Sequence, residues 1–486
     1  MSKVTLQKEK DQEDLRKFGY IQELNRSMNL FTNFAIAFSL ISPLTGISVL
    51  YDYGIQYSGL AGVPLLPIVG IFQFLVAFSL SEIAAIYPVA GGVYKWTTIL
   101  SNKTLGWFSG MAAIIGWSAC GIGVAYGLTQ FLLSLFHIRF ASDLMILTIM
   151  GVLLFSYSIM NLCGMQLVKW FCHASVMIHI VGILLIASLL FIFGQSTTDL
   201  SLESQVLSMD NWPGLLSTVL LCHWVFTGFD ASANVSEESL NPSSSVPLGI
   251  MLSVVISYVL GNLFLLSLGY ATGDVSQIAA SHQPGIFYVI SQVLGPIVSK
   301  YLFLIILVAM FICGLAKQTL IVRMIYALSR DNALPKANVL KVVSPTYEVP
   351  TYSVIVAGAI ILFASIFTVM LPSDPLPLLI AVSALGICLS HAITIASSFK
   401  HLIRYDRRQF RHKPLSIVAR AIAILWLSVI CIIVGFFNIW GVLVVTALLG
   451  VLSIYYFVVL KNDPGYESNI ALSEEDLIRI EKLRRN

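Results

Sequence analysis

Twelve long apolar segments limit what this sequence can fold into. Each has about 20 residues with few charges, the length an α-helix needs to cross a hydrocarbon layer of ~30 Å. Of the 486 residues, 57% are hydrophobic and only 11% are charged, so little polar surface is left to coat a soluble globule. We therefore expect an all-α polytopic membrane protein with twelve transmembrane helices.

The predicted segments follow one another through short polar connections and leave no room for a large soluble domain. They are 29–53, 63–87, 105–136, 144–160, 170–193, 212–236, 247–270, 300–328, 351–371, 376–399, 415–436 and 440–460.

Lysine and arginine are distributed unevenly among the connections. One set contains the basic cluster "KHLIRYDRRQFRHK" at 400–413, whereas the opposite set offers only Arg139 and Lys300. By the positive-inside rule, the segment 1–28 and the tail 461–486 are both cytoplasmic. We expect the plasma membrane or a bacterial inner membrane. The net charge of +3 gives no reason to expect nucleic acid as a partner.

Two of the apolar segments are interrupted by residues that suit a helix poorly. The first contains Pro43 and the step Thr45-Gly46, and the sixth contains Thr227-Gly228 followed by an aspartate. We predict breaks near Pro43–Gly46 and Val225–Gly228. Paired interruptions in two halves of a chain are typical of transporters with inverted repeats. The repeats would be 29–193 and 212–399, with 415–460 appended.

Several motifs occur in the order and at the helices where one known superfamily has them. They are "SEIAAIYPVAGGVYKW" (81–96), "GFDASANVSEESLNP" (228–242), and "RMIYALSRDNALP" (323–335) followed by "VPTYSVIV" (349–356). The chain resembles the amino acid–polyamine–organocation superfamily, and most of all its branch of choline, 4-aminobutyrate and amino-acid permeases. The resemblance implies a leucine-transporter-like fold with a 5+5 inverted repeat plus two helices. It also implies a secondary active transporter that works by alternating access.

The resemblance implies a substrate site at the two breaks. The turn that receives a substrate carboxylate in the first helix of the family matches Leu44, Thr45 and Gly46. Leu44 departs from the small residue that is usual there, which narrows the site or shifts the substrate's head group. An unwound helix offers unpaired N–H groups to an anion and unpaired carbonyls to a cation, so the expectation also has a physical basis.

In the sixth helix, the family's substrate-binding carbonyls match Trp224, Val225 and Thr227, and its motif glycine matches Gly228. Trp224 also matches the gating aromatic residue, and its ring face could hold a quaternary ammonium. Two interpretations remain open for Asp230: a counter-charge for a cationic substrate, or a structural cap on the inner half-helix.

Four further charged residues and one histidine remain as candidates for gating or coupling. Glu237 and Glu238 form either a solvated helix end or an inner gate with Arg323. Alignment with the family places His179 and Lys317 where sodium-coupled relatives bind an ion. Transport would then be independent of sodium and either proton-coupled or exchanging. The alternative for Lys317 is a side chain that extends to the inner membrane surface.

Other classes of function fit the sequence less well. The eight histidines show no metal-binding spacing such as HExxH, and no pore-loop filter is repeated, so neither an enzyme nor a channel is expected. We expect no cofactor and no metal. The expected partners are a small amino acid or amine, protons and the lipid bilayer, and the sequence carries no signal for an oligomeric state. The alternatives are a choline- or polyamine-type organocation permease and a nutrient sensor that has lost transport.

Overall fold

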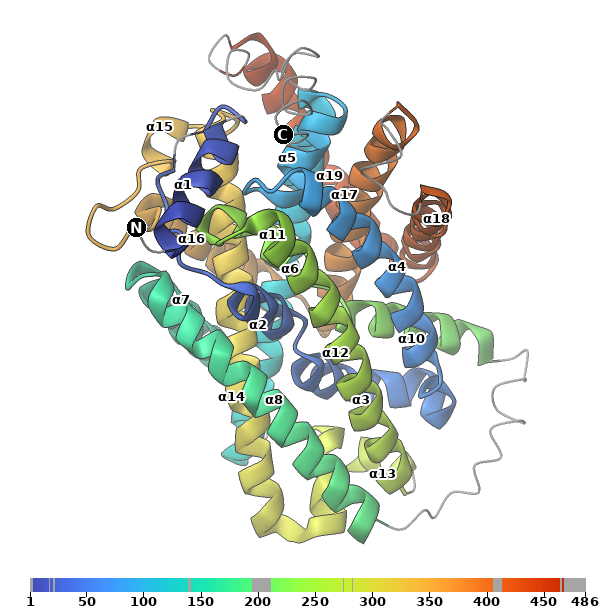
Figure 1. Ribbon diagram of the computed structural model, residues 1–486. Helices are drawn as coiled ribbons and strands as arrows, with labels where there is room; N and C mark the ends of the chain where they lie inside the picture. Colours follow the sequence, from blue (N-terminus) through green and yellow to red (C-terminus); the bar gives the residue numbers. More distant parts are fainter. Residues whose placement is uncertain are drawn as a thin grey trace.

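The computed structural model describes residues 3–16, 18–20, 22–138, 141–194, 211–273, 275–281, 283–404, 413–463 and 466. In these residues the chain is helical, apart from one parallel bridge between Met28 and Ser239 (Figure 1). Eleven helical segments of this part are long and apolar enough to cross a membrane, and α10 (Trp212–Val225) is a shorter apolar helix. The expectation of an all-helical membrane protein is confirmed.

Most of the long helices begin and end within a few residues of the predicted limits. They are α4 (Leu65–Ile86), α6 (Lys103–Leu135), α7 (Asp143–Leu162), α8 (Met165–Phe193), α12 (Pro242–Ala271), α14 (Gly285–Arg330), α16 (Thr351–Val369), α17 (Leu376–Arg404), α18 (Lys413–Phe437) and α19 (Ile439–Val458). The range of α14 joins two helices across a kink at Gly295, whose φ of 75° only glycine adopts easily. The longer of the two starts beside Pro296, within a few residues of the predicted residue 300, and the shorter one from Gly285 was not predicted.

The first apolar segment consists of α2 (Leu30–Ile41) and α3 (Pro43–Ser58), separated by Ser42 in a left-handed conformation (φ 45°, ψ 73°). The break therefore lies one residue before the predicted Pro43–Gly46. Pro43 does not interrupt a helix; it starts one, because the first helical position needs no N–H donor. Leu44, Thr45 and Gly46 accordingly lie in the first turn of α3 and are not unwound.

The sixth segment breaks where it was predicted to break. After α10 ends at Val225, Gly228 adopts a φ of 126°, and the chain continues in the short helices α11 (Ala231–Asn234) and η3 (Ser236–Glu238). A Cβ atom on Gly228 would lie 2.4 Å from the Leu40 side chain and 3.0 Å from the Ile41 nitrogen. The two breaks are therefore in direct contact.

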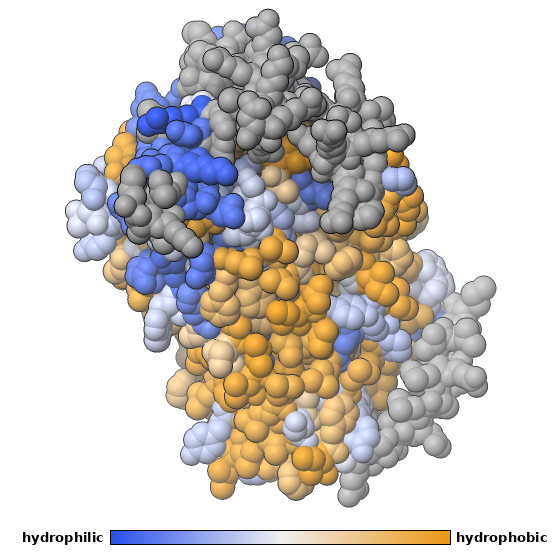
Figure 2. Space-filling model, in the orientation of Figure 1, coloured by the Kyte–Doolittle hydropathy of each residue, from blue (hydrophilic) through white to orange (hydrophobic). Residues whose placement is uncertain are grey.

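The outer helices carry large apolar side chains on their exposed faces, among them Phe155, Phe363, Phe436 and Trp440. Figure 2 shows a broad hydrophobic surface over the middle of the molecule, while hydrophilic residues gather near the N-terminal segment. The segment α2–α3 is buried among the other helices. An apolar exterior around a polar, broken centre is the arrangement expected in a bilayer.

The two ends of the helix bundle can be told apart by short helices. At one end lie α1 (Lys3–Arg16), α5 (Gly92–Leu100) and α15 (Ala337–Leu340), at the top of Figure 1, and we name this the α1 end. At the other end lies α13 (Val275–Ala280), and we name this the α13 end. Arg139, most of the acidic 195–211 connection, most of the basic cluster after Arg404, and nearly all of the tail lie outside the described residues.

Candidate functional site

The start of α3 presents backbone N–H groups at the first break. Pro43 has no N–H, and Ser42 makes no side-chain cap bond, while Gly46 N–H donates to the Ser42 carbonyl at 2.9 Å. In a helix the first N–H groups have no partner within it, so those of Leu44 and Thr45 are available to an anion. Electrostatically this is also the positive end of the α3 dipole.

The end of α10 presents carbonyls at the second break. Thr227 donates twice to the Trp224 carbonyl, from its N–H at 3.2 Å and from its hydroxyl at 2.7 Å. The Trp224 carbonyl is thus already occupied, and Val225 and Thr227 remain as the carbonyls to bind a cation. α3 and α10 pack closely here, because a Cβ on Gly46 would lie 3.3 Å from Val225 Cα.

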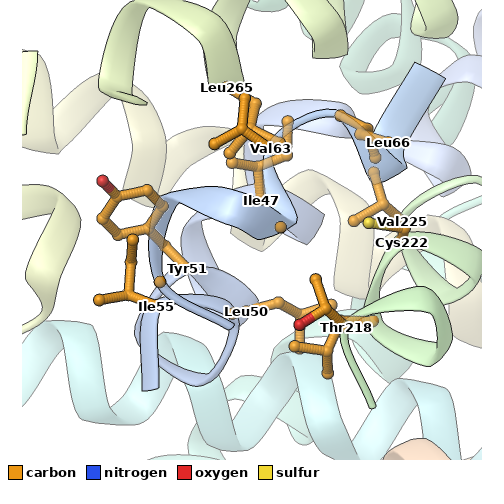
Figure 3. Close-up of a pocket in the computed structure, with 14 residues that line it drawn as sticks. Ile47, Leu50, Tyr51, Ile55, Val63, Leu66, Thr218, Cys222, Val225 and Leu265 are labelled. Carbon is orange, nitrogen blue, oxygen red and sulfur yellow. The ribbon is translucent and has the colours of Figure 1, made fainter. Parts of the chain in front are cut away.

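A small cavity of about 50 Å³ lies beside this contact between α3 and α10 (Figure 3). Apolar side chains such as Ile47, Leu50 and Val225 line it, with Thr218 and Tyr51 as the polar exceptions. The space suffices for one or two water-sized groups. It has no charged lining residue, so it does not fit a substrate's head group.

Trp224 lies between a buried cation and the α13 end. The Lys317 Nζ is 5.7 Å from the ring centres of both Trp224 and Trp117. Lys317 therefore already occupies the aromatic face that the sequence offered to a substrate ammonium. On its other side, Trp224 approaches Gly123, which also contacts Leu376.

Lys317 and His179 both contact the first break. The Lys317 ammonium donates to the Leu40 carbonyl at 2.9 Å, and its side chain is only 2% exposed, so it does not extend to the membrane surface. His179 Nδ1 lies 2.7 Å from the Ser175 carbonyl and Nε2 lies 2.8 Å from the Ser42 hydroxyl. A carbonyl only accepts, so Nδ1 carries a proton, and a neutral ring with Nε2 as acceptor satisfies both contacts.

Two buried ion pairs join η3 to the end of α14. Arg323 Nε donates to Glu238 Oε1 at 2.9 Å, and Arg330 Nη2 donates to Glu237 Oε1 at 2.7 Å. Both glutamates are at most 2% exposed. They are therefore not a solvated helix end. The two pairs close the α1 end beneath the second break.

The N-terminal segment takes part in this closure, which the sequence did not predict. The N–H groups of Ser27 and Met28 both donate to the Glu238 carbonyl at 2.9 Å, and Leu240 N–H donates to the Met28 carbonyl at 2.7 Å. Arg26 donates to the Ser239 carbonyl at 2.7 Å. These bonds go to backbone atoms, which leave no motif in a sequence.

A second cluster at the α1 end links α5 to the residue that follows α14. Lys95 Nζ lies 2.9 Å from Asp331 Oδ2, and Tyr20 donates a hydrogen bond to the same carboxylate. Burial lowers the pKa of the Lys95 ammonium, and the Asp331 carboxylate acts against this shift. The motif at 81–96 therefore contributes its lysine to the closed end.

Asp230 lies in the second break, 1% exposed, with Oδ2 3.5 Å from His391 Nε2 of α17. His391 was missed because a single histidine in an apolar run gives no signal of its partner. Asp230 does not cap α11, since no side-chain cap bond is made there.

A cavity of about 620 Å³ opens at the α13 end and forms a vestibule. Asp52 and Asp374 line it together with Tyr53, Tyr126 and His137, and its lining in the described part of the chain includes no lysine or arginine. Leu376 belongs to the lining and contacts Gly123, the neighbour of Trp224. Leu376 thus connects the lining of the vestibule with the surroundings of Trp224.

Two broken helices in contact, inside a bundle of membrane-length apolar helices and next to buried charges, define a multi-pass membrane transporter. The amino acid permease family model matches residues 28–460. The chain belongs to this family and is a membrane transporter of amino acids or related amines.

Individual relatives are similar over most of the chain. The amino-acid permease BAT1 of Arabidopsis thaliana is 26% identical over 454 residues, which cover 86% of both chains. The GABA-specific permease of Saccharomyces cerevisiae is 25% identical over 381 residues, covering 72% of this chain and 66% of the relative. A putative polyamine transporter of Candida albicans is 27% identical over 377 residues, covering 71% and 66%.

Proposed function

We propose that this protein is a secondary active transporter that moves a small zwitterionic or cationic amine by alternating access. Its core would be a leucine-transporter-like fold of twelve helices, with inverted repeats at 29–193 and 212–399 and two further helices at 415–460. The contact between Gly228 and the Leu40–Ile41 backbone carries the proposal, because it places the two breaks at one site.

The α1 end is the cytoplasmic end in this proposal, with residues 1–28 and the tail 461–486 on that side of a plasma membrane or bacterial inner membrane. The positive-inside rule supports this orientation. Lys95, Lys103, Lys336 and Lys341 lie in or beside the short elements of the α1 end. The vestibule would then open to the outside.

A substrate carboxylate would bind the N–H groups of Leu44 and Thr45, with Gly46 keeping α3 close to α10. The substrate ammonium would bind the carbonyls of Val225 and Thr227, where Gly228 turns the chain. The opposite ends of two helix dipoles would thus bind the opposite charges of one zwitterion.

Asp230 would have a structural role, paired with His391 of α17, and would not contact the substrate. Trp224 would cover the substrate from the vestibule side, and the Arg323–Glu238 and Glu237–Arg330 pairs would form the inner gate. The described lining of the vestibule has two carboxylates and no lysine or arginine, which favours cations and zwitterions over acidic amino acids.

Lys317 would replace a sodium ion, because its ammonium already binds the Leu40 carbonyl, and His179 would fix Ser42 beside it. A buried fixed cation disfavours a second cation at the same place. Uptake would therefore be independent of sodium and would depend on protons or on exchange.

Uptake into proteoliposomes tests the function. A panel of neutral amino acids, 4-aminobutyrate, choline, a polyamine and glutamate should give saturable accumulation of one or more amines and little of glutamate. Relatives named for 4-aminobutyrate and for polyamines make these two compounds the first to measure. Saturable binding without accumulation of any compound would identify a sensor instead.

A further inference from the structure

Asp230 has an unusual environment for a carboxylate. Both of its side-chain oxygens are buried and have no hydrogen-bond partner in the described part of the chain. The ion pair that the structure shows for Asp230 is with His391, whose Nε2 lies 3.5 Å from Asp230 Oδ2. The His391 ring is 3% exposed and packs on Phe229, with ring centres 5.7 Å apart.

Several charged side chains on the helices packed around this pair have partners of their own. They are Lys95 with Asp331, Glu237 with Arg330, Glu238 with Arg323, Lys317 with the Leu40 carbonyl, Glu82 with Arg420, and Lys103 with the Tyr466 carbonyl. The helices α2, α12 and α19 carry no charged side chain. None of these groups therefore neutralises Asp230.

His223 on α10 is the other histidine near the pair. Its Nδ1 lies 2.6 Å from the Gln73 amide and its Nε2 lies 3.2 Å from Cys388 Sγ, and it interacts electrostatically with His391. Two imidazolium rings would repel each other here, so His223 limits the cluster to one positive ring. The thiols of Cys120, Cys388 and Cys431 lie on the surrounding helices α6, α17 and α18.

A buried carboxylate without hydrogen bonds or a counter-charge is costly, so this pair is stable with one proton. With one proton, the pair is either a carboxylate beside an imidazolium or a carboxylic acid beside a neutral imidazole, and both forms have zero net charge. Loss of the proton leaves a lone negative charge, and a second proton leaves a lone positive charge. The geometry thus sets the number of protons at one.

We infer that Asp230 and His391 form a proton-binding site whose single proton is exchanged with water during the transport cycle. The inference rests on the proposed function and deepens it. The site joins the broken α10–α11 segment to α17, so a movement of either helix changes the 3.5 Å contact. Only an N–H or O–H bond forms and breaks, and the proton comes from water on one side and leaves to water on the other.

The inferred proton site does not involve His179, the histidine at the first break. The neutral His179 ring already satisfies both of its neighbours, whereas Asp230 has no donor other than a protonated His391.

Two transport assays with one set of variants test the inference. The variants are Asp230→Asn, His391→Gln, the double variant, and His173→Gln. The last is a histidine control, because the His173 Nε2 lies 3.1 Å from the Thr32 hydroxyl, away from the pair. Accumulation driven by a pH gradient is measured at external pH values from roughly 5 to 8. Counterflow at equal pH on both sides reports translocation that needs no coupling.

The double variant should keep counterflow but lose pH-driven accumulation, and its uptake should no longer depend on pH. Wild type and His173→Gln should show both activities. Wild-type pH dependence in the double variant would overturn the inference, and so would loss of counterflow in normally inserted protein, because Asp230 would then serve the substrate. Absence of counterflow in the wild type would instead contradict the proposed function.

Infrared difference spectra of the purified protein give a measurement that does not rely on transport by a variant. Lowering the pH should produce carboxyl or imidazole bands from the pair in the wild-type spectrum. These particular bands should be missing from the spectra of Asp230→Asn and His391→Gln. Identical difference spectra in all three proteins would overturn the inference.

Discussion

Ser42 allows the first break to form at a residue that is not glycine. Its left-handed backbone costs roughly 1–2 kcal/mol for an ordinary side chain. The Ser42 hydroxyl lies 2.8 Å from His179 Nε2 and 2.6 Å from Thr45 Oγ1, and these contacts offset the cost. The strain and its compensation lie at the proposed substrate site, where such conformations are often found.

Ser42→Ala should lower the stability of the protein by about 1–3 kcal/mol, because the His179 acceptor is left unsatisfied in a buried site. Thermal unfolding in detergent and uptake in proteoliposomes measure the two effects. Ser48→Ala is the matched control, since the Ser48 hydroxyl is buried in α3 and has no hydrogen-bond partner among the residues that the structure describes. Equal losses in both variants would contradict a role for the Ser42 contacts.

Lys317→Ala should impair uptake more than His179→Ala does, because it removes the charge that holds the Leu40 carbonyl. Wild-type uptake should be the same in sodium and in N-methylglucamine buffer. In Lys317→Ala, added sodium should restore part of the activity by occupying the vacated site. A strict sodium requirement in the wild type would refute the assignment.

At the scale of elements, the two broken segments depend on glycine in different ways. Gly228 combines a φ of 126° with a Cβ position only 2.4 Å from Leu40 Cδ2, so both its backbone and its surroundings exclude a side chain. Gly46 is helical, and a Cβ there would lie 3.3 Å from Val225. The second break is therefore fixed more strictly than the first.

Gly228→Ala should abolish uptake, whereas Gly46→Ala should reduce it and Gly46→Leu should abolish it. Gly435→Ala is the control, because a Cβ on Gly435 meets no atom within 4 Å. Uptake is compared at equal amounts of inserted protein. Normal transport by Gly228→Ala would show that the two segments need not touch.

The sequence predicted the helices well and the contacts between them poorly. Hydropathy alone was enough to predict the positions of helices such as α4 and α16, because a bilayer requires apolar runs of about the same length. The break at Ser42 was misplaced, since a proline was interpreted as the end of a helix and not as its first residue. The pairing of Asp230 with His391 joins distant segments, and no local pattern reports such a contact.

At the scale of the whole molecule, the two ends differ in how they are closed. Buried ion pairs such as Arg323–Glu238, together with the N-terminal segment, fill the α1 end, whereas the α13 end has the vestibule of about 620 Å³. Asp52 accepts a hydrogen bond from Gly285 N–H, and Asp374 accepts one from Leu376 N–H. Both carboxylates are thus held in place at the entrance, and no lysine or arginine in the described part of the vestibule lining compensates their charge.

The double variant Asp52→Asn/Asp374→Asn should weaken the apparent affinity for a cationic amine more than for a zwitterion, because amide oxygens keep the two hydrogen bonds without the charge. The difference from wild type should shrink at high salt. Glu348→Gln, at an exposed residue between α15 and α16, removes a charge at the α1 end and serves as the control. Equal effects on both kinds of substrate would exclude electrostatic attraction by the vestibule.

The Lys317 ammonium differs from a dissolved ion in one thermodynamic respect. It is covalently part of the chain and donates to the Leu40 carbonyl, so it cannot be released on one side of the membrane and replaced from the other. A cation that returns with the protein in every cycle performs no net work, whatever its local binding energy. If Lys317 takes the place of sodium, concentrating a substrate must draw its free energy from another gradient.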